Sequence, residues 1–299
     1  MRKPKPRRWG ERLIEAAIKS TGVATIVFVL LIFVFLLKES VPLFGYPKQA
    51  ASLLGTRWLP TSEPEQFGLI PLLLGSLYVT LGAMVISVPL GLACSIFIAE
   101  VAPRWLRELL KPLVELLAAI PSVVFGALGV LLLGPWFANI FHLPVGQFAA
   151  LGSLLLAFMA IPTIVSVSED ALHAVPMALR AGSLALGATH WQSITRVVLP
   201  TARSGLIAAG LLGLGRAIGE TMTVLMVTGN AAVLPQGLKG FILPVRTMTA
   251  TIAAEMGETA HNTTHYFALF LIGLLLFLIT LVVNVVAEVV LERMGREAK

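Results

Sequence analysis

Long apolar runs alternate with short charged stretches along the whole chain. A membrane-spanning helix needs about 20 predominantly apolar residues, and the apolar runs lie at 21–37, 66–99, 116–168, 206–228 and 266–287. The pattern therefore predicts an all-α, polytopic membrane protein.

The run at 116–168 holds 53 residues without Asp, Glu, Lys or Arg. This is too long for one membrane helix. Gly134-Pro135 and Pro144 offer a break, because proline disfavours a continuing helix. We expect two helices joined by a short external hairpin here, which brings the predicted number of spans to six.

Composition and charge agree with a membrane protein. Apolar residues make up 57% and charged residues 13% of the chain, whereas soluble domains carry about 25% charged residues. The formal net charge of +6 does not indicate nucleic-acid binding, because most basic residues lie in short connections. With both termini in the cytoplasm, the cytoplasmic segments hold 16 Lys/Arg and the external ones five, as the positive-inside rule requires.

The expected organisation follows from these runs. It comprises a basic cytoplasmic segment (1–20), a first transmembrane helix (21–38), an external segment (39–66), a transmembrane domain (67–290) and a cytoplasmic tail (291–299). The transmembrane domain contains a cytoplasmic connection at 169–203 and an external loop at 229–265.

Arg216 and Glu220 interrupt the fifth apolar run. Their spacing of four places both on one face of a helix, and each costs about 2.5–3.5 kcal/mol at the centre of a bilayer on insertion scales. An ion pair offsets part of this, and Gly215 and Gly219 permit close helix approach. The pair either joins helices or lines a path, and a guanidinium suits a tetrahedral oxyanion.

A short repeat points to further polar positions. Ala119-Ile-Pro-Ser-Val-Val124 and Ala160-Ile-Pro-Thr-Ile-Val165 match at a spacing of 41 residues. A proline kink beside a hydroxyl side chain can line a polar path, although helix packing explains the similarity equally well. We add Ser122, Thr163 and Thr221 to Arg216 and Glu220 as candidate path residues.

Signatures of enzymes are missing from the sequence. There is no phosphate-binding G-x-x-x-x-G-K-[ST] loop, and the five histidines show no metal-ligand spacing. We expect no catalytic residue, cofactor or metal, so ATP hydrolysis would take place in a separate subunit.

The connection before the fifth run exposes apolar residues to the cytoplasm. It has helix-compatible stretches on either side of a glycine, with Met177, Leu179, Leu184 and Leu186 among few charges. Such a segment fits the groove of a partner, or folds back on the membrane domain.

The same connection resembles the signature of binding-protein-dependent ABC importer permeases, which is Glu-Ala-Ala, three residues, Gly, nine residues, Ile, one residue, Leu-Pro. Gly187, Val197, Leu199 and Pro200 fall at these intervals, whereas Ala181-Gly182-Ser183 replaces Glu-Ala-Ala. In this family the segment docks into the ATPase. The resemblance implies coupling roles for Ala181, Gly182, Ser183, Leu184, Gly187, Ala188, Thr189, Leu199 and Pro200.

Further motifs resemble phosphate-importer permeases of the PstC type, and they lie at 119–126, 161–172, 185–189, 215–221, 244–249 and 253–257. The resemblance implies the MetI-like permease fold and a place in the bacterial inner membrane, among its lipids. It also implies a PstA-type second permease, two ATP-binding subunits and an external phosphate-binding protein as partners. The family's charged pair implicated in phosphate movement corresponds to Arg216 and Glu220.

The expected function is therefore the permease subunit of an ATP-driven phosphate importer, coupled to its ATPase through 175–200. Two alternatives stay open. One is a permease for another oxyanion, such as sulfate or molybdate, and the other is a secondary transporter that uses Arg216 and Glu220 for coupling.

Overall fold

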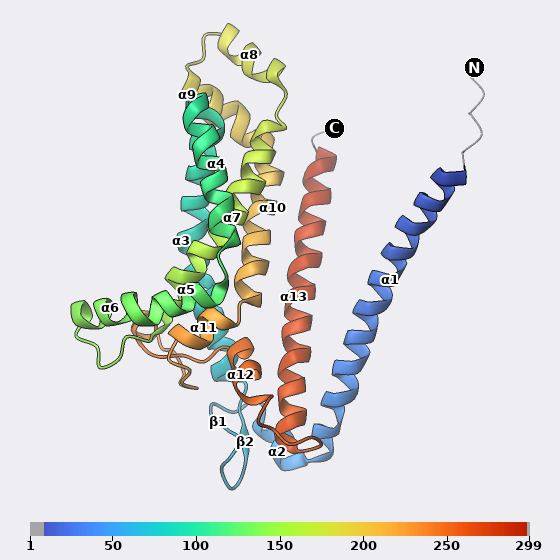
Figure 1. Ribbon diagram of the computed structural model, residues 1–299, viewed down its shortest axis with the longest axis vertical. Coiled ribbons are helices and arrows are strands. Elements are labelled where there is room, and N and C mark those ends of the chain that lie inside the picture. Colours follow the sequence, from blue (N-terminus) through green and yellow to red (C-terminus); the bar gives the residue numbers. More distant parts are fainter. Residues whose placement is uncertain (1–8, 298–299) are drawn as a thin grey trace.

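The computed structural model describes the backbone of residues 9–297 and the side chains of residues 14–289. The predicted basic residues before position 9 and the last two residues of the predicted tail lie outside the described residues. The described part of the chain is almost entirely helical, with one two-stranded antiparallel hairpin that pairs Trp58 with Phe67 (Figure 1).

The amino-terminal half begins with α1 (Trp9–Ser40), a 3-10 turn (Val41–Gly45), α2 (Pro47–Ser52), β1 (Trp58–Leu59) and β2 (Gln66–Phe67). It continues with α3 (Ile70–Ile96), α4 (Arg104–Ala119), α5 (Ser122–Leu128), α6 (Gly134–Phe141) and α7 (Ala149–His173).

The carboxy-terminal half consists of α8 (Met177–Ala185), α9 (His190–Ser193), α10 (Leu199–Gly219), α11 (Met222–Val227), a 3-10 turn (Leu238–Ile242), α12 (Met248–Glu255) and α13 (Thr264–Glu297). A π-helical turn (Ile194–Val198) joins α9 to α10, so that one continuous helix runs from His190 to Gly219.

Within the described residues, six helices are long and apolar enough to cross a membrane, which confirms the predicted number. They are Ile14–Gly45, Ile70–Val101, Ser122–Phe141, Ala149–His173, His190–Gly219 and Thr264–Val289. The first turns of α1, the last turns of α13 and α8 all lie toward the upper end of Figure 1.

α7 is the central helix, packed between α3 and α10. Its Ile164 is fully buried and fits between two glycines. A Cβ on Gly91 of α3 would lie 2.7 Å from Ile164 Cγ2, and one on Gly213 of α10 would lie 2.6 Å from Ile164 Cγ1. Small residues thus let three membrane helices approach closely, as is typical of helix packing in lipid.

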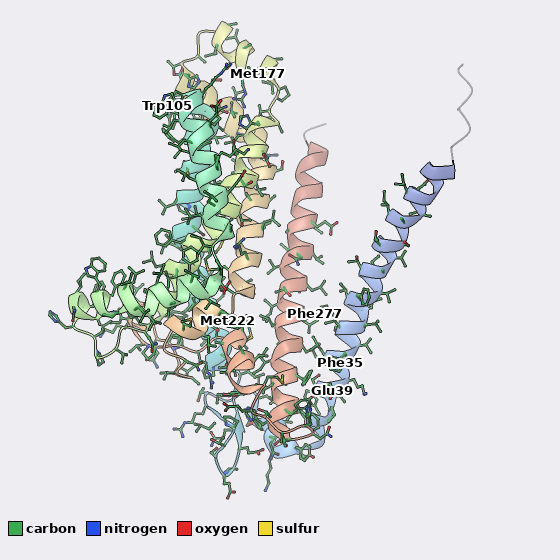
Figure 2. The ribbon with its side chains drawn as sticks, in the orientation of Figure 1. Phe35, Glu39, Trp105, Met177, Met222 and Phe277 are labelled. Carbon is green, nitrogen blue, oxygen red and sulfur yellow. The ribbon has the colours of Figure 1, made fainter. Side chains whose placement is uncertain are left out.

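α1 lies apart from this core and meets α13 at the lower end of both helices in Figure 1. Phe33 packs on Phe277 and Phe35 on Phe270, with ring centroids 5.7 and 5.5 Å apart. Most of the remaining apolar side chains of α1 are exposed (Figure 2), as expected for a helix surrounded by lipid or by another subunit.

The segment 41–67 and the loop before α13 fold onto one another beneath the helices. Trp58 and Phe67 are buried against α13, and Trp58 Nε1 donates to the Glu255 carboxylate at 3.1 and 3.2 Å. Glu255 also forms an ion pair with Arg246 at 2.6 Å and a hydrogen bond with His265 Nε2 at 2.8 Å. A half-buried carboxylate with three partners holds this end of the molecule together.

Two details of the third span differ from the prediction. Gly134-Pro135 does not break the helix, because a π-helical turn (Gly129–Leu133) leads directly into α6, and such a wide turn relieves the clash between a proline ring and the preceding carbonyl. The predicted break between the third and fourth spans lies at 142–148, around Pro144, between α6 and α7. A further break at Ile120-Pro121 separates α4 from α5. The charged residues Arg104, Arg107, Glu108 and Lys111 lie in the first half of α4.

Candidate functional site

α10 ends at Gly219, and this changes the expected geometry of Arg216 and Glu220. Glu220 has extended backbone (φ −70°, ψ 133°), so the two residues do not share one helix face. Among the described residues, the structure contains no ion pair between them. The expected pair is therefore wrong, because the i, i+4 rule holds only in an unbroken helix.

Glu220 instead serves the beginning of α11. Its Oε1 accepts a hydrogen bond from the Thr223 backbone N–H at 3.3 Å, and a carboxylate is favourable beside the unpaired N–H groups of a first helical turn. Its backbone carbonyl accepts a hydrogen bond from Thr249 Oγ1 at 2.8 Å. The break after Gly219 is thus held by side-chain and backbone contacts from α11 and α12.

The guanidinium of Arg216 remains available to a ligand. Its described hydrogen bond runs from Nη1 to Thr163 Oγ1 of α7 at 3.4 Å, and the side chain is exposed in the isolated chain. Arg216 also lines a cavity of about 290 Å³ between α10 and α13, together with Thr280 and Asn284 of α13. A cation that is hydrogen-bonded to one hydroxyl and open to a cavity can bind an oxyanion through its remaining donors.

Thr223, which the sequence reasoning missed, joins the two helix breaks. Its side chain is fully buried, and its Oγ1 donates to the Ser122 carbonyl at 2.9 Å. Ser122 begins α5, directly after the break at Pro121. The signal available in the sequence was a threonine three residues after a glutamate, which is too common to single out.

The five predicted path residues therefore form one neighbourhood with unequal roles. Thr163 contacts Arg216 directly, and Ser122 reaches Glu220 through Thr223. Thr221 Oγ1 donates to the Gly219 carbonyl at 3.3 Å, so it serves its own backbone. The repeat does not produce two equivalent kinks, since Pro121 separates two helices while Pro162 lies buried inside α7.

The predicted coupling segment forms the short helix α8 and the turn after it, at the far end of the molecule (Figure 1). Met177 and Leu186 are 77% and 91% exposed. Figure 2 shows Met177 there, with Trp105 of α4 at the same end of the molecule. Large apolar side chains on a protruding helix indicate a docking surface.

Gly187 ends α8 in a left-handed conformation (φ +85°). Its N–H donates to the Leu184 carbonyl at 3.0 Å, and the Ala188 N–H donates to the Ser183 carbonyl at 3.1 Å. These two bonds form a Schellman cap, which glycine favours because it lacks a Cβ. The glycine of the sequence signature thus terminates the helix.

Thr189 begins the next helix with a capping box. Its Oγ1 accepts the Gln192 N–H at 3.2 Å, and its own N–H donates to Gln192 Oε1 at 2.9 Å. This reciprocal pair satisfies donors at the start of the helix. The Thr-x-x-Gln spacing was readable in the sequence.

The other predicted coupling residues differ in exposure. Ser183 is buried, with its Oγ 2.7 Å from Ser193 Oγ, which ties α8 to α9. Ala181, Gly182 and Leu184 are exposed, Ala188 is half-buried, and Leu199 and Pro200 form the first turn of α10. The predicted coupling residues between Ala181 and Thr189 thus lie around the cap at Gly187, whereas Leu199 and Pro200 begin α10, the helix that contains Arg216.

Comparison with known proteins identifies the relatives of this chain. Residues 87–296 match the family described as binding-protein-dependent transport system inner membrane component. The phosphate transport system permease protein PstC of Haemophilus influenzae is 35% identical over 94% of this chain and 94% of its own length. The probable ABC transporter permease protein YqgH of Bacillus subtilis is 39% identical over 76% of this chain and 73% of its own length.

Solved structures support the same fold. A chain of the MetNI methionine ABC transporter, in an inward-facing conformation, superposes with a TM-score of 0.60 at 20% identity. The superposition covers 78% of this chain and 99% of that one. The two chains share the fold of an ABC importer permease, as the sequence resemblance implied.

Proposed function

Because this chain belongs to the binding-protein-dependent transport system inner membrane components, we propose that it is the permease subunit of an ATP-driven phosphate importer. Its place would be the bacterial inner membrane, with both chain ends in the cytoplasm. The main observation in favour of phosphate as the substrate is the position of the Arg216 guanidinium. It lies beside a helix break, is open to a cavity, and has no carboxylate partner among the described residues.

Phosphate suits this arrangement for electrostatic reasons. The planar guanidinium donates to two oxygens of a tetrahedral anion at once, and its charge is poorly screened in a membrane-embedded cavity. Glu220, four residues further on, adds a negative charge that opposes tight retention of the anion. Weak enough binding is required for release to the other side.

The partners follow from the same proposal. A PstA-type second permease would complete the path, an external phosphate-binding protein would deliver the anion, and two ATP-binding subunits would drive the cycle. The exposed apolar side chains of α8, among them Met177 and Leu186, support docking of an ATP-binding subunit there. This permease would then hydrolyse no ATP itself.

Uptake of labelled phosphate at low concentration tests the function. The host cells lack their own importer, receive the partner subunits, and carry either wild type or Arg216→Gln, with sulfate or molybdate in excess as competitor. We expect ATP-dependent uptake that the competitors leave unchanged and that the substitution reduces by two orders of magnitude or more, on the order of 3–4 kcal/mol.

Each other outcome selects a different function. Uptake that persists without the ATP-binding subunits would identify a secondary transporter. Strong competition by sulfate or molybdate would identify a permease for another oxyanion. Unchanged uptake by Arg216→Gln at normal membrane levels would assign Arg216 to helix packing and remove the phosphate path from this cavity.

A further inference from the structure

Asn284 places a primary amide in the apolar span of α13. It is not one of the path residues that were predicted from the sequence. The span Thr264–Val289 is the most hydrophobic of the six in the described chain. The Asn284 side chain is exposed there and forms no hydrogen bond with the described residues. Because an unpaired amide is costly to bury in hydrocarbon, a polar group or water has to face it in the assembled protein.

The cavity beside Arg216 supplies that surrounding. Asn284 and Thr280 line it from α13, and Arg216 lines it from α10. Thr280 Oγ1 is already engaged with its own helix, at 3.0 Å from the Leu276 carbonyl and 2.9 Å from the Phe277 carbonyl. Asn284 is therefore the α13 side chain in this cavity that has both donors and acceptor free.

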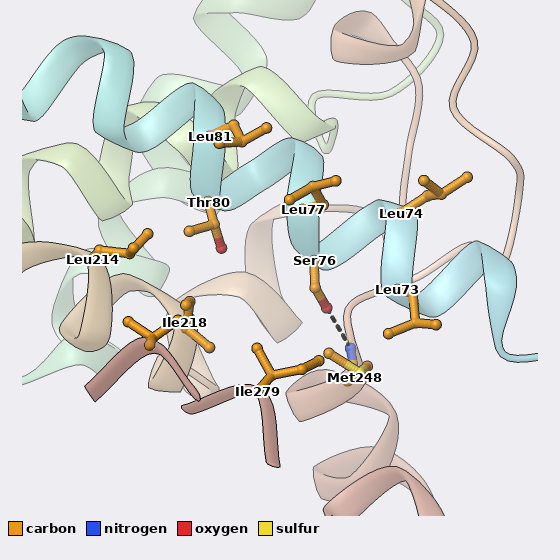
Figure 3. Close-up of a pocket in the computed structure, with 11 residues that line it drawn as sticks. Leu73, Leu74, Ser76, Leu77, Thr80, Leu81, Leu214, Ile218, Met248 and Ile279 are labelled. Atoms are coloured by element: carbon orange, nitrogen blue, oxygen red, sulfur yellow. Dashed lines mark hydrogen bonds between the residues drawn. The ribbon is translucent and has the colours of Figure 1, made fainter. Parts of the chain in front are cut away.

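A neighbouring cavity shows that this polarity is local. It measures about 360 Å³, shares Ile218 and Val283 with the first one, and is otherwise lined mostly by leucines and other apolar side chains (Figure 3). Its Ser76 hydroxyl is occupied, because it accepts the Met248 N–H at 2.9 Å. The cavity that α3 helps to line is thus mostly apolar, whereas the cavity between α10 and α13 also contains Arg216, Thr280 and Asn284.

We propose that Asn284 contacts the transported oxyanion together with Arg216 and favours hydrogen phosphate over sulfate. The proposal rests on the proposed function and deepens it. The amide N–H donates to an unprotonated oxygen of the anion, and the amide oxygen accepts from the P–OH group. Sulfate is fully ionised at neutral pH and carries no such hydrogen, so it leaves the acceptor unpaired, which is unfavourable in a site shielded from water.

The first test measures accessibility and occupancy. Asn284→Cys is made in a Cys94→Ser background, because Cys94 is the one cysteine of the chain, and the assembled transporter is treated with a negatively charged methanethiosulfonate. Val285→Cys is the matched control, since Val285 is 49% exposed but does not line this cavity. We expect Asn284→Cys to react and phosphate to slow the reaction several-fold, while phosphate leaves the control unchanged.

The second test measures selectivity. Asn284→Leu keeps the size but loses the hydrogen bonds, and we expect it to raise the KM for phosphate about tenfold, since one hydrogen bond to a charged group is worth this much. Inhibition by sulfate should become stronger relative to wild type. Asn284→Asp should abolish uptake by repelling the anion, and Asn284→Gln should restore part of the selectivity. Val285→Leu, at a position that does not line the cavity, should behave as wild type.

The outcomes separate this proposal from the function on which it rests. Absence of ATP-dependent phosphate uptake by wild type rejects the proposed function, and protection by sulfate or molybdate in the cysteine assay then shows whether Asn284 still meets an anion. Normal uptake by wild type with unchanged KM and sulfate inhibition in Asn284→Leu rejects Asn284 alone. If Asn284→Leu fails to assemble, Asn284→Gln and Asn284→Cys decide. The role of Asn284 is rejected if Asn284→Gln has the same KM for phosphate and the same sulfate inhibition as wild type, and if phosphate does not slow the reaction of Asn284→Cys.

Discussion

Arg180 of α8 binds both carboxylate oxygens of Glu100, at 2.5 and 2.6 Å, although 80 residues separate them in the chain. The same guanidinium donates to the Leu172 carbonyl near the end of α7 at 2.6 Å. The two side chains are only 18% and 5% exposed. Arg180 therefore holds the protruding helix α8 against the end of α7 and the turn that follows α3.

Replacement of Glu100 should loosen α8. In Glu100→Gln, Arg180 loses its charged partner, and we expect a local destabilisation of about 1.5–3 kcal/mol. Backbone amides of α8 should exchange hydrogen faster, and ATP hydrolysis should lose its dependence on substrate while membrane levels stay normal. Glu108→Gln, at an exposed position of α4, is the control. Unchanged exchange in α8 of Glu100→Gln would show that other contacts hold this helix.

Two glycines of the predicted coupling segment should respond oppositely to alanine. Gly187 has φ +85° and open space around its Cβ position, so Gly187→Ala should cost about 1–2 kcal/mol through backbone strain alone. Gly182 lies inside α8, also with open space, and Gly182→Ala should stabilise the helix by about 0.5–1 kcal/mol. Thermal unfolding of the purified transporter and coupled ATP hydrolysis report both effects, and Gly187→Asn should retain function because asparagine tolerates this conformation. Equal behaviour of the two alanine variants would contradict the role of the cap.

Arg216 and Glu220 should act independently in stability. A double-mutant cycle with Arg216→Gln and Glu220→Gln should give a coupling free energy below about 0.5 kcal/mol, the value found for residues that share no interaction. Unfolding of the detergent-solubilised transporter measures it. A coupling above about 1 kcal/mol would restore the ion pair that the sequence suggested.

The cluster of Trp58, Arg246 and His265 around Glu255 should make stability depend on pH. Burial raises the pKa of Glu255, but hydrogen bonds from His265 and Trp58 and the charge of Arg246 outweigh it, so the pKa lies below its ordinary value of 4.5. A lowered pKa stabilises the fold above pH 4.5, and this contribution is lost as the pH falls through the folded-state value. Glu255→Gln should cost about 1–3 kcal/mol at neutral pH.

The pH dependence of the melting temperature, compared between wild type and Glu255→Gln, tests the role of Glu255. Melting temperatures of wild type should fall as the pH drops below 4.5, and those of Glu255→Gln should fall less. Parallel profiles of the two proteins would show that Glu255 is not the group responsible.

The six spans were predictable because apolar length is a local property that a bilayer constrains strongly. The break around Pro144 was predictable as well, whereas the break at Pro121 was not, because a proline in an apolar run can also lie inside a helix, as Pro162 does in α7. The end of α10 at Gly219 was missed for a related reason. A glycine in an apolar run indicates helix packing as readily as a helix terminus. Here a local hydrogen bond from Thr223 and a tertiary one from Thr249 both bind Glu220, directly after the terminus.

The sequence indicated individual residues of the candidate site but not which of them contact one another. Arg216 stood out because a charge in a membrane span is expensive. Its partner Thr163 comes from α7, 53 residues earlier, and no local pattern relates the two. Arg180 and Glu100 were equally hidden, since each looks like an ordinary charge at a membrane boundary until α8 folds back on the ends of α3 and α7.

The long helix from His190 to Gly219 connects the region of α8 with Arg216, so a rotation at one end displaces the other. Arg216 lies 26 residues beyond His190, which corresponds to about 40 Å along the axis at about 1.5 Å per residue. A tilt of about 5° around the end near α8 would displace the guanidinium by about 3.5 Å, as small rigid-body rotations of packed helices do. That displacement equals the whole 3.4 Å separation of Arg216 and Thr163. A small rotation at the end of this helix near α8 is therefore magnified at the cavity where we propose that the anion binds.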